Sequence, residues 1–193
     1  MNTNKIIGLS GTFASGKDTL AHYLVKEKNY LHVSTGDMVR QEALMLRGSV
    51  ERPVLQEVAD ELRRKHGAGV LVDLAVKTYQ ERLKERDDCD GLVVSGLRSL
   101  GEAKVVKSAG GVLVFVDAPE ELRYQRMVSR KRDAETQLTL AEFKKQEALE
   151  LEGHAGDDAA FNILAIKDMA DKIIINDSDL NTFIERCQQE IGF

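Results

Sequence analysis

A glycine-rich segment near the start of the chain limits what this sequence can fold into. The segment Gly11-Thr-Phe-Ala-Ser-Gly16-Lys17 fits the pattern G-x-x-x-x-G-K of loops that bind phosphate groups. Residues 5–10 before it form an apolar run typical of a buried parallel strand, and residues 18–26 after it carry apolar side chains at helical spacing. A loop between a strand and a helix points its backbone N–H groups at one site, where the helix N-terminus adds partial positive charge. The segment therefore predicts a binding site for a polyphosphate.

We expect this loop to hold the phosphates of ATP. Its two glycines allow backbone angles that a Cβ atom would forbid, and Lys17 reaches the terminal phosphates. Asp18 stands where such loops usually have Ser or Thr, and its carboxylate and the hydroxyl of Thr19 are hard oxygen ligands suited to Mg²⁺. An ordinary acid at a helix N-terminus is the alternative interpretation of Asp18. The expected nucleotide contacts are Gly11, Thr12, Phe13, Ala14, Ser15, Gly16, Lys17, Asp18 and Thr19.

Length and charge argue against several classes of protein. The chain has 193 residues, which suffices for one domain with a sizeable core. Its net charge of −5 argues against nucleic acid or a membrane surface as the main partner. No stretch approaches the roughly 20 apolar residues of a membrane span, and the segment before the first expected strand is too short for a signal peptide. With only two cysteines, far apart, we expect a cytoplasmic protein with reduced thiols.

Short apolar strands alternate with longer helical segments along the chain. Continuous apolar runs such as residues 112–116 suit parallel strands that are covered on both faces. Parallel neighbours need right-handed crossovers, so the pattern predicts an α/β fold, a P-loop NTPase three-layer α/β/α sandwich with a five-stranded parallel sheet. The strands are expected at residues 5–10, 30–34, 91–95, 111–117 and 172–176. The helices are expected near residues 17–28, 37–47, 52–66, 69–85, 100–108, 119–131, 140–151, 158–168 and 179–190.

Two segments are too long to be simple crossovers within the single expected domain, residues 1–193. Residues 36–90 insert about three helices between the second and third strands and are predicted to bind a phosphoryl acceptor. Residues 131–160 insert a charged segment before the last strand and are predicted to form a lid. The core of the domain is then expected to comprise residues 1–35, 91–130 and 161–193.

A second motif, Ser34-Thr-Gly-Asp-Met-Val-Arg40, follows the second expected strand. Alone it indicates a helix start, in which the Ser34 side chain caps the helix and the Asp37 side chain, three residues later, bonds back to the backbone of the cap residue. In its place after the phosphate-binding loop, the segment closely resembles the acceptor-site signature of adenylate kinases. The resemblance implies that Thr35 and Arg40 contact the phosphate or sugar of an acceptor nucleotide, with Asp37 beside them. Arginine suits this role because its planar group binds a phosphate through two hydrogen bonds and stays charged.

The third expected strand ends in Ser95-Gly-Leu-Arg98. In adenylate kinases the equivalent strand ends in Asp-Gly, followed by an arginine that holds the acceptor phosphate, so the resemblance implies that role for Arg98. Glu102 resembles the position that contacts the edge of the acceptor base, and a local Arg98–Glu102 pair on a helix is the alternative. Ser95 departs from the family, which has an acid there that helps to order the water molecules of Mg²⁺.

Arginines also follow the fourth expected strand, at positions 123, 126 and 130. Cations are favoured at a solvated helix C-terminus, which explains them without any ligand. The segment resembles the helix that leads into the lid of nucleoside monophosphate kinases. The resemblance implies that Arg126 and Arg130, together with Lys17, are catalytic and neutralise the transferred γ-phosphoryl group.

Nearly the whole chain resembles the adenylate-kinase-like proteins of archaea, relatives of dephospho-CoA kinase, through the motifs above and through residues 52–63 and 170–177. The resemblance implies transfer of a phosphoryl group from ATP, with Mg²⁺, to a small-molecule partner, a nucleoside or deoxynucleoside monophosphate. Two alternatives stay open. One is dephospho-CoA kinase, with Asp37 as the general base for a ribose hydroxyl. The other is an ATP-binding switch or scaffold without an acceptor, to which Ser95 in place of the acid lends support. The sequence does not indicate an oligomeric state.

Overall fold

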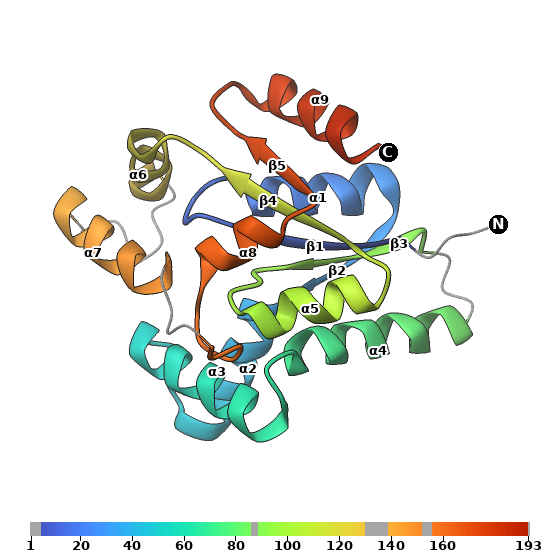
Figure 1. Ribbon diagram of the computed structural model, residues 1–193, viewed down its shortest axis with the longest axis vertical. Helices are drawn as coiled ribbons and strands as arrows, with labels where there is room; N and C mark the ends of the chain where they lie inside the picture. Colours follow the sequence, from blue (N-terminus) through green and yellow to red (C-terminus); the bar gives the residue numbers. More distant parts are fainter. Residues whose placement is uncertain (1–4, 86–88, 130–138, 152–155, 193) are drawn as a thin grey trace.

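In the part of the chain that the structure describes, five strands form one parallel sheet (Figure 1), in the order β2–β3–β1–β4–β5. The computed structural model describes residues 5–85, 89–129, 139–151 and 156–192. The strands are β1 (Lys5–Gly11), β2 (Tyr30–Ser34), β3 (Gly91–Ser95), β4 (Val112–Asp117) and β5 (Lys172–Ile175). The helices are α1 (Lys17–Lys28), α2 (Thr35–Arg47), α3 (Arg52–His66), α4 (Val70–Lys84), α5 (Leu100–Ser108), α6 (Glu120–Ser129), α7 (Leu140–Leu151), α8 (Ile163–Met169) and α9 (Leu180–Ile191).

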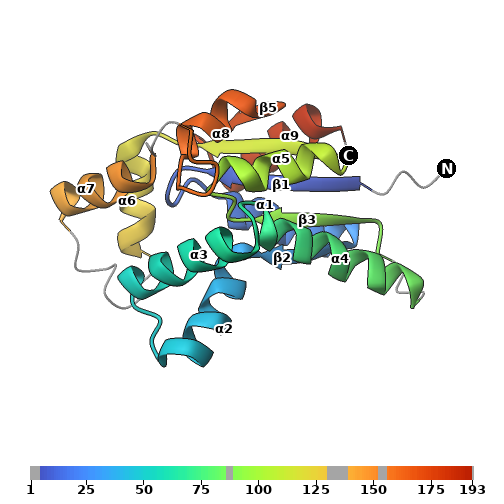
Figure 2. The same cartoon turned by 60° about the horizontal axis from the view of Figure 1, so that its bottom comes forward.

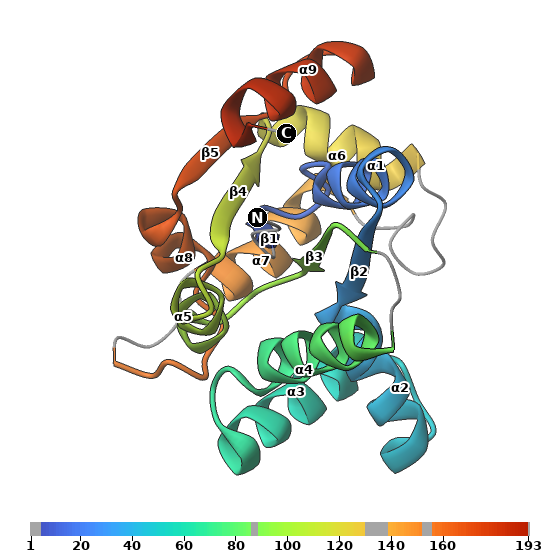
Figure 3. The same ribbon diagram turned by 90° about the vertical axis from the view of Figure 1, so that its right-hand side faces the viewer.

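Helices cover both faces of the sheet, which confirms the three-layer α/β/α sandwich. Helices α1 and α9 lie on one face, and α4, α5 and α8 lie on the other (Figure 3). Apolar side chains fill each interface, because the central strands of a doubly covered sheet are buried on both sides. On the α1 and α9 side, Leu20, Leu24 and Phe183 pack against strand residues such as Leu9. On the other side, Tyr79 and the helices around it pack against β1, β3 and β4.

The long segment between β2 and β3 folds mostly away from the sheet. Helices α2 and α3 form a small core of their own with the start of α4, which Figure 2 shows below the sheet. Its buried members are Val39, Ala43, Val58, Ala59 and Leu71. Helices α6 and α7 lie beyond the carboxyl ends of the strands (Figure 1). None of the helices in the described part of the chain combines the length and the apolar character that crossing a membrane requires.

One expected element is wrong at its start. The helix predicted for residues 158–168 begins only at Ile163, because the side chain of Asn162 accepts a hydrogen bond of 2.9 Å from the backbone N–H of Ala165 and so caps the helix. Phe161, just before the cap, forms an isolated bridge with Ser99. Residues 158–160 form a turn, and Asn162 donates its backbone N–H to the carbonyl oxygen of Arg98 at 2.8 Å, so this segment lies against the turn after β3. The other expected strands and helices are found within two residues of their predicted ends wherever the structure describes the chain.

Candidate functional site

The loop between β1 and α1 depends on glycine at position 16. Gly16 has a φ of +104°, and a Cβ atom there would lie 2.2 Å from Nδ2 of Asn176. That amide group donates a hydrogen bond of 2.8 Å to the carbonyl oxygen of Ser15, so the chain after β5 braces the loop. The hydroxyl of Ser15 is buried and has no hydrogen-bond partner within the described residues. Because such a group is costly inside a protein, a phosphate oxygen seated in the loop fits the site.

Asp117 ties the start of this loop to the end of β4. Its Oδ1 atom accepts a hydrogen bond of 2.8 Å from the hydroxyl of Thr12, and its Oδ2 atom accepts one of 2.8 Å from Nζ of Lys167. Burial raises the pKa of Asp117, but the hydrogen bonds from Lys167 and Thr12 outweigh it and bring the pKa below the ordinary value. The sequence analysis missed this residue. The available signal was an acid at the carboxyl end of the strand that pairs with β1.

Asp18 and Thr19 lie in the first turn of α1, directly after Lys17. Both are partly exposed. Within the described residues no group of three or more His, Cys, Asp and Glu side chains has the arrangement of a metal site. Mg²⁺ that is shared with substrate phosphates needs only one or two protein oxygens and keeps several water molecules. The two residues therefore fit Mg²⁺ that is held jointly with a nucleotide.

The serine at the end of β3, Ser95, is in hydrogen-bond contact with a histidine. Nε2 of His32, in β2, lies 2.8 Å from Oγ of Ser95. Burial and the nearby His22 lower the pKa of His32, and the carboxylates of Asp18 and Asp37 act in the opposite direction. The net lowering favours the neutral imidazole at physiological pH. The sequence does not indicate this contact, because His32 and Ser95 come together only when β2 and β3 pair.

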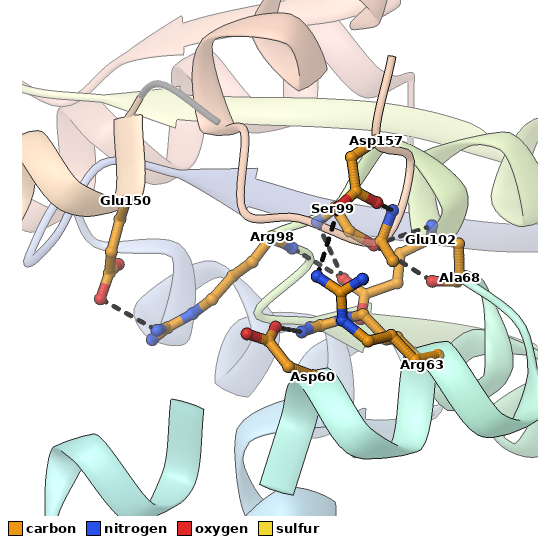
Figure 4. Close-up of polar contacts among 10 residues, drawn as sticks. Asp60, Arg63, Ala68, Arg98, Ser99, Glu102, Glu150 and Asp157 are labelled. Carbon is orange, nitrogen blue, oxygen red and sulfur yellow. Dashed lines mark hydrogen bonds and ion pairs between the residues drawn. The ribbon is translucent and has the colours of Figure 1, made fainter. Parts of the chain in front are cut away.

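A small pocket lies between the loop and the turn after β3. Lys17 contributes to it from the loop, Arg98 from the turn, and Glu150 from α7. Its lining residues are Gly11, Phe13, Lys17, Gly96, Leu97, Arg98, Glu150 and Ile163. Nη1 of Arg98 donates a hydrogen bond of 3.0 Å to Oε1 of Glu150 (Figure 4), and Arg52 of α3 donates to the same atom. Burial acts to raise the pKa of Glu150, but the charges of Arg98, Arg52 and Lys17 bring it below the ordinary value. The carboxylate is therefore ionised at neutral pH.

One face of α7 holds Glu150 at the pocket. Phe143, Glu147 and Glu150 are spaced i, i+4 and i+7, and all three are buried. The ring of Phe143 packs against Phe13 of the phosphate-binding loop, with ring centroids 5.9 Å apart. Glu147 forms a buried ion pair with Arg123 of α6. Helix α7, which was expected in the lid, thus packs against the loop through Phe143 and pairs with α6 through Glu147. The sequence analysis did not identify Glu150 as a candidate site residue.

Glu102 does not lie where the sequence led us to expect it. Its side chain is buried under the turn after β3 (Figure 4). Oε1 accepts hydrogen bonds from Nε and Nη2 of Arg63, at 3.1 and 2.8 Å. Oε2 accepts hydrogen bonds from the backbone N–H groups of Arg98 and Ser99, at 2.7 and 3.3 Å. The expected contact with the edge of a base is therefore wrong, and so is the alternative Arg98–Glu102 side-chain pair. Glu102 positions the backbone of Arg98 instead.

The expected acceptor residues of α2 lie beside the pocket lining rather than in it. Thr35 is buried, and its hydroxyl donates a hydrogen bond of 2.8 Å to the carbonyl oxygen of Gly96, which is a lining residue. Asp37 and Arg40 form an ion pair of 2.6 Å on the exposed first turns of α2. A contact of Asp37 or Arg40 with an acceptor stays a prediction.

Of the two arginines expected to be catalytic, the structure describes only Arg126. Arg126 of α6 donates hydrogen bonds of 3.2 Å to the backbone carbonyl and to the side-chain oxygen of Asn176. Asn176 in turn braces the phosphate-binding loop, so Arg126 contacts a residue that supports this loop, and its contact with a γ-phosphate stays a prediction. Arg130 lies outside the described residues.

Comparison with known proteins identifies a family model and several proteins to which this chain is similar. A family model described as an AAA domain matches residues 7–150. A UPF0200 protein of Saccharolobus islandicus is 32% identical over 190 residues, which is 97% of this chain and 92% of the relative. A UPF0200/UPF0201 protein of Archaeoglobus fulgidus is 29% identical over 188 residues, and the chain spans about half of it, 54%.

Solved structures support the fold. Shikimate kinase from Bacteroides thetaiotaomicron superimposes with a TM-score of 0.59 and 13% sequence identity, over 98% of this chain and 99% of that one. At that identity the likeness shows the fold alone, an α/β fold with a parallel sheet and a phosphate-binding loop. From the family model and the Saccharolobus relative, we conclude that the chain belongs to the AAA domain family and to the UPF0200 proteins.

Proposed function

We propose that this protein transfers the γ-phosphoryl group of ATP to a nucleoside or deoxynucleoside monophosphate. The observation that carries the proposal is the pocket, which Lys17 of the phosphate-binding loop and Arg98 of the turn after β3 line together. A cation on the donor side and a second one from a different element suit two anionic substrates that meet there. Phosphoryl transfer needs positioning and charge neutralisation more than covalent help, and this arrangement offers both.

On the donor side, the loop amides, the hydroxyl of Ser15 and Lys17 would hold the phosphates of ATP. Asp117 keeps Thr12, and with it the start of the loop, in place. Asp18 and Thr19 would hold Mg²⁺. When bound, this ion supplies charge neutralisation at the β- and γ-phosphates.

On the acceptor side, Arg98 would hold the phosphate, and Thr35 would position the turn that carries it. A role for Arg40 requires its side chain to leave Asp37. During transfer, the bond between the γ-phosphorus and the β–γ bridging oxygen breaks, an acceptor oxygen forms the new bond, and ADP leaves. A monophosphate is already an anion at neutral pH, so it needs no general base. Arg126 would act through Asn176 as a positioning residue, and the direct role of Arg126 and Arg130 at the γ-phosphate stays a prediction.

ADP release from Mg²⁺ and ATP tests the proposal. The panel comprises ribo- and deoxyribonucleoside monophosphates and dephospho-CoA, and we expect one monophosphate to stimulate release strongly. Arg98→Ala should lose this stimulation and keep ATP binding, whereas Arg47→Ala, at an exposed pair with Glu61, should behave as wild type.

Two results would replace the proposal with an alternative. Stimulation by dephospho-CoA alone would indicate a hydroxyl acceptor, and Asp37→Asn should then abolish the activity if that residue is the base. Binding of ATP without stimulation by any compound, and with no effect of Arg98→Ala, would indicate a nucleotide-dependent switch.

A further inference from the structure

Two arginines from distant parts of the chain converge on one carboxylate oxygen. Arg52 begins α3, Arg98 follows β3, and both donate to Oε1 of Glu150. The side chain of Glu150 is 4% exposed, whereas those of Arg52 and Arg98 are 30% and 34% exposed. The carboxylate therefore lies at the bottom of the cluster, and the guanidinium groups reach its accessible edge.

Aromatic rings hold both guanidinium groups in place. That of Arg52 lies over the ring of Phe13, 5.3 Å from its centroid, and that of Arg98 lies over the ring of Phe161, at 5.4 Å. Cation–π contacts of this kind favour one orientation of the planar group. The backbone N–H of Arg98 is further fixed by the buried Glu102. The two groups are thus oriented by contacts other than those with Glu150.

The chemistry of this cluster matches an anion better than it matches one carboxylate oxygen. Each guanidinium offers a fork of N–H donors that suits two oxygens of a phosphate. Here both groups donate to the same Glu150 oxygen, and Arg52 also donates a hydrogen bond of 3.0 Å to the neutral side-chain oxygen of Gln146. A phosphate monoester has three terminal oxygens and up to two charges, so it could give each arginine an oxygen of its own. Lys17 lines the same pocket as Glu150. The two substrates would have to meet in this pocket.

We propose that Arg52 and Arg98 form the anion subsite for the acceptor phosphate, and that Glu150 competes for it from within the chain. The acceptor's anionic group takes the place of the Glu150 carboxylate on both guanidinium groups. The identity of the anion as the acceptor rests on the proposed function, whereas the subsite itself rests on the contacts. A neutral molecule would compete poorly, because it brings no negative charge to replace the carboxylate that it displaces from the two partly exposed guanidinium groups. The site therefore selects acceptors that carry an anionic group.

Binding of inorganic phosphate tests the subsite. Titration calorimetry would be run with saturating Mg²⁺ and ADP, so that the phosphate-binding loop is occupied and does not bind the probe itself. Glu150→Gln keeps the shape of the side chain and removes its charge. We expect this variant to bind phosphate about tenfold more tightly than wild type, because the competing charge is gone. Adding Arg52→Ala to Glu150→Gln should remove the gain.

Controls keep the result specific. Glu61→Gln removes a carboxylate from an exposed arginine pair and should leave phosphate affinity unchanged. Glu150→Ala serves as a second variant, with the thermal unfolding midpoint as the check that each protein folds. Equal phosphate affinities of wild type and both Glu150 variants would overturn the proposal. So would a gain in affinity that persists after Arg52→Ala.

The outcomes also separate this inference from the proposed function. If Glu150→Gln loses phosphoryl transfer while its phosphate affinity equals that of wild type, then Glu150 acts on the reacting atoms and the competitor role is wrong. If ADP does not bind at all, the proposed function fails. In that case the existence of the subsite would still be decided by whether Arg52→Ala weakens the binding of phosphate.

Discussion

Removing the buried carboxylate of Glu102 should destabilise the protein strongly. Glu102 accepts four hydrogen bonds, two from the Arg63 guanidinium and two from backbone N–H groups of the turn after β3. The side chain of Arg63 is 2% exposed, and that of Glu102 is 0% exposed. Glu102→Ala leaves the Arg63 charge buried, with only Asp60 at 3.9 Å on its exposed side. We therefore expect the free energy of unfolding to fall by about 3–5 kcal/mol.

Urea denaturation followed by circular dichroism measures this loss, which corresponds to a decrease in Tm of roughly 6–20 °C for a chain of this length. Glu61→Ala, at the exposed pair with Arg47, is the matched control and should cost less than about 1 kcal/mol. Adding Arg63→Met to Glu102→Ala should recover part of the loss, because no unpaired charge then remains buried. The reasoning is refuted if Glu102→Ala unfolds like wild type and instead raises the KM for the acceptor. That pair of results would mean that Glu102 faces the substrate.

Four further predictions concern residues of the candidate site and residues of the surrounding core. Lys17→Ala should abolish ATP binding in calorimetry while leaving Tm within a few degrees of wild type. Phe143→Ala should lower the free energy of unfolding by about 3–5 kcal/mol, because the ring is fully packed between the loop and α6. The pKa of Asp117 is below its ordinary value in the folded protein, so its stabilising contribution is present above that value and is lost as pH falls through the folded-state pKa. In denaturation at pH values that decrease from about 4, the ordinary pKa of an aspartate, the stability difference between wild type and Asp117→Asn should shrink. Burial raises the pKa of Cys187 to about 12, so this thiol should resist alkylation at neutral pH until the protein is unfolded, as mass spectrometry would show.

Local patterns were sufficient for most of the fold. The spacing of glycines and lysine between an apolar run and a helical segment predicts the phosphate-binding loop, and the structure places it between β1 and α1. The apolar run at residues 112–116 predicts a strand that is covered on both faces, and β4 is indeed buried. Ser34 predicts the start of α2, where its side chain accepts a hydrogen bond from the backbone N–H of Asp37. These features depend on neighbours in the sequence, which is why the sequence alone predicts them.

The helix predicted to start at residue 158 shows where local patterns fail. Residues 158–162 have a composition compatible with a helix, but they lie across the turn after β3. There Asn162 donates its backbone N–H to the carbonyl oxygen of Arg98, at 2.8 Å. A contact between segments about 60 residues apart decides the conformation, and no short window of sequence contains it.

The residue patterns were enough to predict the class of fold and the phosphate-binding loop. Which charged side chains contact one another depends on the packing of distant segments. Glu102 has the spacing of a surface pair with Arg98, yet the fold brings Arg63 of α3 to it in a buried position. Arg52 and Glu150 are 98 residues apart, and they meet because the start of α3 and the end of α7 come together in the folded chain. A charge on a helix has the same local appearance whether it faces water or a buried partner, so packing alone can assign its role.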